Sequence, residues 1–96
     1  MEYQIYVDGK HAATLGSASG WEAAAAWIEK RTAERTPLRR LAELGETYQP
    51  EQAAAMLSKL LKDQKPRPEI AHTLQHLHHF LTGDHVVIMY GVMDEQ

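Results

Sequence analysis

Three histidines recur along one predicted helix at positions 72, 76 and 79, and this spacing places their rings in a row on one face. Two imidazoles four residues apart on a helix can chelate a divalent transition metal, and a third one turn later can assist. His72, His76 and His79 are therefore candidate ligands for zinc or another divalent transition metal. The zinc-peptidase pattern His-Glu-x-x-His is absent, because Thr73-Leu74-Gln75 separates the first pair. A solvated or partner-contacting face and a response to mild acid are the alternative interpretations of this row.

Signatures of the common enzyme classes are missing from the sequence. There is no cysteine to act as a nucleophile, and Ala18 stands where a Gly-x-Ser-x-Gly elbow would need serine. The chain also lacks the glycine-rich patterns that cradle phosphates or dinucleotides. We therefore predict no catalytic residue and favour a binding function over catalysis.

Positive charge is concentrated in two segments of an otherwise acidic chain. Residues 30–40 carry a net +4 and residues 56–68 a net +3, whereas the whole chain carries −3 with histidine neutral. Such patches are either interaction surfaces or solvated helix faces. Tryptophan, tyrosine and arginine are enriched at the energetic centres of protein interfaces. The candidate contact residues for a protein partner are Trp27, Arg39, Arg40 and Tyr48. In the alternative interpretation, the two aromatic side chains simply close the rim of the core.

A nucleic-acid-binding function is a rival interpretation of the same charges. The predicted helices over residues 37–44 and 50–62 have the lengths and the short link of a helix-turn-helix pair. Recognition helices read bases mainly from their N-terminal half, and Glu51 and Gln52 occupy that half here. Nucleic acid is therefore the less favoured partner.

Strands are predicted at both ends of the chain, with helices between them. Alternating side chains predict a strand over residues 2–7, and Asp8-Gly9 predicts a two-residue turn that returns the chain along residues 10–15. Ser19 with Glu22 forms a potential capping box for the first helix. Cap residues, prolines and apolar spacing predict helices over residues 20–34, 37–44, 50–62 and 68–81. Residues 85–93 predict a last strand that is apolar on both faces.

These elements predict an α+β fold in a single domain spanning residues 1–96. We expect a three-stranded, mainly antiparallel sheet, made of the N-terminal β-hairpin and the C-terminal strand and packed by about four helices. The C-terminal strand would then lie at an edge of the sheet. Because an exposed apolar edge invites pairing, either a helix covers this strand or two copies form a homodimer through it.

The composition favours a cytosolic protein without a membrane segment. A secreted domain of 96 residues usually carries disulfides, and this chain has no cysteine. Its N-terminus does not have the pattern of a signal peptide, and its longest strongly apolar run, residues 86–90, is too short to span a bilayer. We expect a small, non-catalytic regulatory domain from a bacterium or phage that binds another protein. A histidine-based metal protein and a nucleic-acid-binding regulator are the alternatives.

Overall fold

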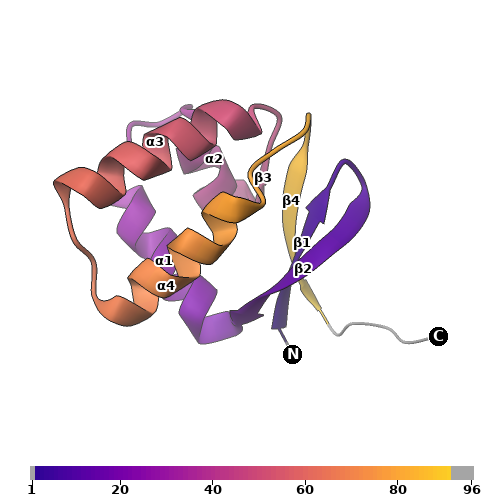
Figure 1. Ribbon diagram of the computed structural model, residues 1–96, viewed down its shortest axis with the longest axis horizontal. Coiled ribbons are helices and arrows are strands. Elements are labelled where there is room, and N and C mark those ends of the chain that lie inside the picture. Colours follow the sequence, from indigo (N-terminus) through magenta and orange to yellow (C-terminus); the bar gives the residue numbers. More distant parts are fainter. Residues whose placement is uncertain (1, 92–96) are drawn as a thin grey trace.

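Four helices pack on one side of a four-stranded antiparallel sheet in the computed structural model, which describes residues 2–91 (Figure 1). The α+β class and the order of the main elements match the sequence-based expectation. The strands are β1 (Glu2–Val7), β2 (Lys10–Ser17), β3 (Glu46–Thr47) and β4 (Val86–Gly91). The helices are α1 (Ala18–Glu29), α2 (Pro37–Leu44), α3 (Pro50–Asp63) and α4 (Pro68–His79).

The β1–β2 hairpin forms at the turn that the sequence predicts. Asp8 and Gly9 have φ values of 52° and 84°, and a type I′ turn requires positive φ at both central positions. Strand β2 extends two residues beyond its predicted end, to Ser17. Its register against β1 shifts twice, between Tyr3 and Gln4 and between Ile5 and Tyr6. Such bulges twist an edge strand and make it a poor template for pairing with another chain.

The sheet has the order β2-β1-β4-β3, so the first and last strands of the described residues lie side by side at its centre. Strand β4 pairs antiparallel with β1 along its whole described length, from Glu2↔Gly91 to Val7↔Val86. The expectation of three strands was incomplete, because the two-residue strand β3 pairs with the start of β4. The predicted edge position of the C-terminal strand was therefore wrong for this part of β4, which lies between β1 and β3. Residues 92 and 93 of the predicted last strand lie outside the described residues.

Helix α1 begins and ends earlier than the sequence predicts. Its N-cap is Ser17, whose side chain accepts from the Gly20 amide, so the predicted Ser19–Glu22 capping box was wrong. The helix ends at Glu29, rather than near residue 34, and side chains then satisfy carbonyls of its last turn. Thr32 Oγ1 donates to the Ile28 carbonyl at 2.9 Å and Arg39 donates to that of Glu29 at 3.0 Å.

Helix α2 has the boundaries that its sequence predicts. The Thr36 side chain accepts from the Arg39 amide, Pro37 occupies the first turn, and Gly45 ends the helix with a left-handed φ of 76°. Leu38 and Leu41 are fully buried. Leu44 continues their spacing but is 62% exposed, because it lies beyond the edge of the core.

The hydrophobic core lies between the helices and one face of the sheet. From the sheet, Ile5 and Val86 are fully buried and Ile88 nearly so. The helices contribute Trp21, Ala24, Ile28, Leu38, Leu41, Ala53, Leu57, Ile70, Leu74 and Leu77. The alanines let α1 approach its neighbours closely, and burial of the larger side chains supplies most of the stabilisation. Within residues 2–91, no helix has the length and apolar character needed to cross a bilayer.

Candidate functional site

The most exposed large apolar side chains of the described residues gather around one edge of the sheet. Leu44 and Tyr48 flank strand β3, and each is 62% exposed. Met89 and Tyr90 lie on the neighbouring strand β4 and are 55% and 48% exposed. We call these four residues the β3–β4 surface. Met89 and Tyr90 are consecutive residues of a strand, so their side chains project from opposite faces of the sheet and border the β4 edge on both sides. Large exposed apolar side chains around one edge are typical of a site of protein interaction.

Strand β3 covers only the first part of the β4 edge. Glu46 and Thr47 pair with Val87 and Val86, and the Ile88 amide donates to the Gly45 carbonyl at 2.7 Å. Among residues 2–91, no strand pairs with Met89–Gly91 on the side away from β1. Main-chain groups alternate in direction along an antiparallel ladder, so those of Tyr90 point to the same side as those of Ile88. The Tyr90 N–H and C=O therefore face an open edge.

A polar cluster fixes the other end of the β3–β4 surface. His85 Nε2 lies 2.9 Å from Glu46 Oε1, and a carboxylate oxygen can only accept, so His85 donates from Nε2. The ring of Tyr48 stacks on the His85 ring with centroids 4.2 Å apart and planes 3° from parallel. The stacking therefore holds the exposed ring of Tyr48, a predicted contact residue, in one orientation.

Trp27 and Arg39, two of the other predicted contact residues, are largely taken up by internal contacts. Trp27 is only 8% exposed, and the Arg31 guanidinium lies 4.4 Å from its ring centroid. Arg39 donates from Nη1 to the carbonyls of Glu29 and Thr32, at 3.0 and 2.7 Å. Its Nε lies 3.0 Å from Glu43 Oε2 as an ion pair, although the N–H is not aligned for a hydrogen bond.

Arg40 differs from its neighbour Arg39 because it is exposed. The four predicted contact residues thus do not form one site. Tyr48 belongs to the β3–β4 surface, Arg40 lies on the outer side of α2, and the other two hold the α1–α2 connection in place.

The predicted histidine row lies on α4 but its rings do not converge on a common point. His72 and His79 are exposed, whereas His76 Nε2 donates to the Thr14 carbonyl at 3.1 Å. Phe80 packs edge-on against His76 and His79, with ring centroids 5.4 and 5.0 Å apart. No group of three or more His, Asp or Glu side chains within residues 2–91 is arranged to hold a metal ion.

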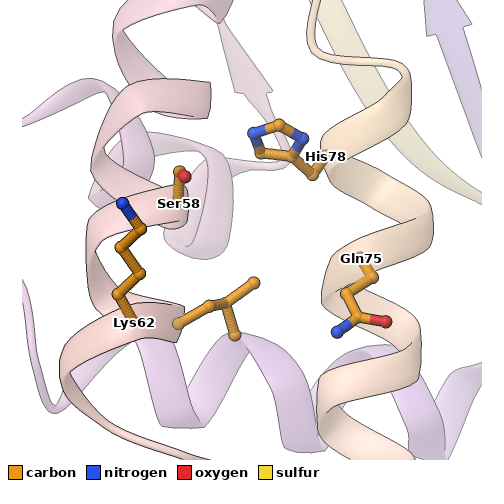
Figure 2. Close-up of a pocket in the computed structure, with 5 residues that line it drawn as sticks. Ser58, Lys62, Gln75 and His78 are labelled. Atoms are coloured by element: carbon orange, nitrogen blue, oxygen red, sulfur yellow. The ribbon is translucent and has the colours of Figure 1, made fainter.

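A groove of about 280 Å³ separates α3 from α4 (Figure 2). Ser58 and Lys62 line it from α3, and Gln75 and His78 line it from α4. A serine beside a histidine is the pairing that nucleophilic catalysis uses, but no hydrogen bond joins Ser58 to His78 in the described part of the chain. The groove therefore carries no nucleophile–base pair.

Sequence reasoning identified Tyr48 and the apolar last strand but missed the rest of the β3–β4 surface. Leu44 continues the spacing of three that Leu38 and Leu41 share, although those two are buried and Leu44 is exposed. Gly45 is the signal that distinguishes Leu44 from the two buried leucines. A glycine that ends a helix puts the preceding residue at the helix terminus, where the core-facing stripe no longer applies.

Comparison of the chain with models of known protein families, with curated proteins and with solved structures finds no match.

Proposed function

We propose that this chain is a small, non-catalytic protein-interaction domain of the cytosol, and that the β3–β4 surface pairs with a second copy of itself. The observation that carries the proposal is the coincidence of an open strand edge with the most exposed large apolar side chains. Main-chain groups at such an edge give affinity, and the apolar side chains beside it add buried area.

The shape of the edge supports a symmetric partner. In an antiparallel pairing of two β4 strands about a two-fold axis at Tyr90, the two Tyr90 residues would exchange both N–H···O bonds. The open residues Met89, Tyr90 and Gly91 carry no charge, so the two-fold axis brings no like charges together along them. The β2 edge, with its two register shifts, is the less suitable alternative.

The short open segment of β4 implies that the contact between the two copies is weak. Three described residues provide few main-chain bonds, so side-chain burial by Leu44, Met89 and Tyr90 has to supply most of the affinity. We expect a weak dimer with a dissociation constant on the order of 10 µM, typical of a small interface.

Sedimentation velocity over a concentration series into the high micromolar range tests this proposal. The wild-type chain should form dimers, and Met89→Lys should shift the dissociation constant upward by about tenfold or more, because a charge would be buried. The matched control is Ala12→Lys, which adds the same charge at an exposed position on the β2 edge. Tyr90→Pro removes the outward-facing donor together with the exposed ring and should also weaken the dimer.

Circular dichroism of each variant shows whether it is folded before its association is compared. A wild-type chain that stays monomeric throughout the series would contradict the proposal. A dimer that Ala12→Lys weakens as much as Met89→Lys would also contradict it, because the contact would then depend on net charge and not on this edge.

A further inference from the structure

The structure joins the two basic segments that lie apart in the sequence. Nine of the ten Lys and Arg residues fall within residues 30–40 and 56–68, and only Lys10 lies elsewhere. Arg31 Nε, from the first segment, donates to Gln64 Oε1, in the second, at 2.7 Å. The α1–α2 connection and the C-terminal half of α3 therefore lie against each other, and Arg31 and Lys59 come from them to one surface, which we call the basic face.

An apolar groove of about 290 Å³ lies in this basic face. Met56 and Leu60 of α3, both partly buried, contribute apolar side chains to its lining. Arg31 and Lys59 line it together with a single acidic residue, Asp63. The volume suits one large apolar side chain, and the cations beside it suit negative charge on either side of that side chain.

The groove is held in shape by contacts that do not need a ligand. Arg31 lies over the Trp27 ring and donates from Nη1 to the Trp27 carbonyl at 3.0 Å. Arg39 fixes the same connection through the carbonyls of Glu29 and Thr32. A binding site whose side chains are already ordered loses less conformational entropy when a partner binds.

We propose that this groove binds an acidic segment of a partner protein, with one large apolar side chain of that segment inserted between Met56 and Leu60. Charge complementarity identifies this occupant, because the surrounding positive charge attracts carboxylates and the apolar lining requires a nonpolar anchor. A nucleic acid fits less well, since no aromatic side chain lines the groove for base stacking and Asp63 would repel phosphates. The groove shares no residue with the β3–β4 surface, so this inference goes beyond the proposed self-association.

Fluorescence anisotropy with short labelled peptides tests the inference on the full chain. The probe peptide has one central phenylalanine between runs of acidic residues, and a second peptide has alanine in place of the phenylalanine. We expect the alanine peptide to bind about tenfold more weakly, because its small side chain leaves the groove unfilled. A labelled DNA duplex of similar charge is the third probe.

The decisive comparison uses two variants that make the same charge change. Lys59→Glu, at the groove, should weaken binding of the phenylalanine peptide by about five- to tenfold, whereas Lys10→Glu, on the hairpin, should change it by less than about twofold. Both positions are exposed, so neither variant should alter the fold. Met89→Lys should leave peptide binding unchanged, which separates this test from that of the dimer.

Three results would overturn the inference. Equal weakening by the two lysine variants would mean that binding follows net charge alone. Equal affinity for the phenylalanine and alanine peptides would show that no apolar anchor enters the groove. Binding of the DNA duplex in a Lys59-dependent manner, without binding of the peptide, would assign the basic face to nucleic acid instead.

Discussion

Asp8 and His85 are joined by two hydrogen bonds although 77 positions separate them in the chain. The Asp8 amide donates to the His85 carbonyl at 2.8 Å, and the His85 amide donates to Asp8 Oδ1 at 3.0 Å. The same carboxylate oxygen accepts from the Asp84 amide at 2.9 Å. The hairpin turn therefore holds the loop that leads into β4.

Replacing Asp8 should loosen this connection. Asp8→Ala removes the oxygen that accepts two amides and places alanine at a φ of 52°, so we expect the free energy of unfolding to fall by about 2–3 kcal/mol. Asp8→Asn keeps an acceptor oxygen and tolerates positive φ, so its loss should stay under about 1 kcal/mol. Urea denaturation followed by tryptophan fluorescence measures both. Equal losses in the two variants would contradict a role for the carboxylate oxygen.

Gly45 should be more sensitive to substitution than another glycine with a similar backbone conformation. A Cβ at Gly45 would lie 2.9 Å from the Ile88 carbonyl oxygen, whereas a Cβ at Gly9 would meet nothing within 4 Å. Both glycines have positive φ, 76° and 84°. Gly9→Ala should therefore cost about 1 kcal/mol from backbone strain alone, and Gly45→Ala about 2–4 kcal/mol because β3 must also move away from β4. Thermal and urea denaturation of the two variants, compared side by side, test this difference.

Adjacent arginines on α2 should respond differently to the same change. Arg39→Met removes two hydrogen bonds to carbonyls of the α1–α2 connection, so we expect a loss of about 1–3 kcal/mol in the free energy of unfolding. Arg40→Met changes an exposed side chain and should stay within about 0.5 kcal/mol of wild type. Indistinguishable denaturation curves for the two variants would mean that Arg39 does not support the connection.

Tyr3 should make the protein less stable in alkaline solution. Burial raises the pKa of its hydroxyl above the ordinary value of 10.0, and the Glu22 carboxylate and Tyr90 add to this increase. The unfolded chain then loses this proton at a lower pH than the native protein does, so the native state binds more protons in alkaline solution. The stability contributed by neutral Tyr3 is fully present below pH 10.0 and is lost as the pH rises through the native pKa.

Tyr3→Phe removes the titrating group and provides the measurement. Its free energy of unfolding should fall less steeply than that of wild type above pH 10.0, in urea titrations carried out at a series of alkaline pH values. The same slope in both proteins would show that ionisation of Tyr3 is not linked to folding.

Much of this fold could be predicted from turn and helix-cap residues that are recognisable in the sequence. Asp8-Gly9 permits a type I′ turn, whose twist matches that of the two strands beside it, and Thr36-Pro37 with Gly45 marks the two ends of α2. These signals depend on the conformational limits of one or two residues, so they hold whatever the rest of the chain does.

The features that the sequence did not predict depend on contacts between distant residues. Strand β3 has two residues, too few for any alternation, and exists because Gly45, Glu46 and Thr47 meet β4. Helix α1 ends at Glu29, whose carbonyl accepts a hydrogen bond from Arg39, ten residues further along the chain. Trp27 was a candidate contact residue, and the Arg31 guanidinium lies over its ring. No periodicity within a single element contains this information.

The central pairing of β1 with β4 has a consequence for how fast the chain folds. Glu2 lies opposite Gly91, so this ladder closes a loop that contains nearly all of the described residues. The β1–β2 hairpin and the four helices make local contacts that can form early, but the ladder forms only after the entropy of that long closure has been overcome. The helices would then stay loosely packed until β4 pairs with β1, and this pairing would be the rate-limiting step of folding.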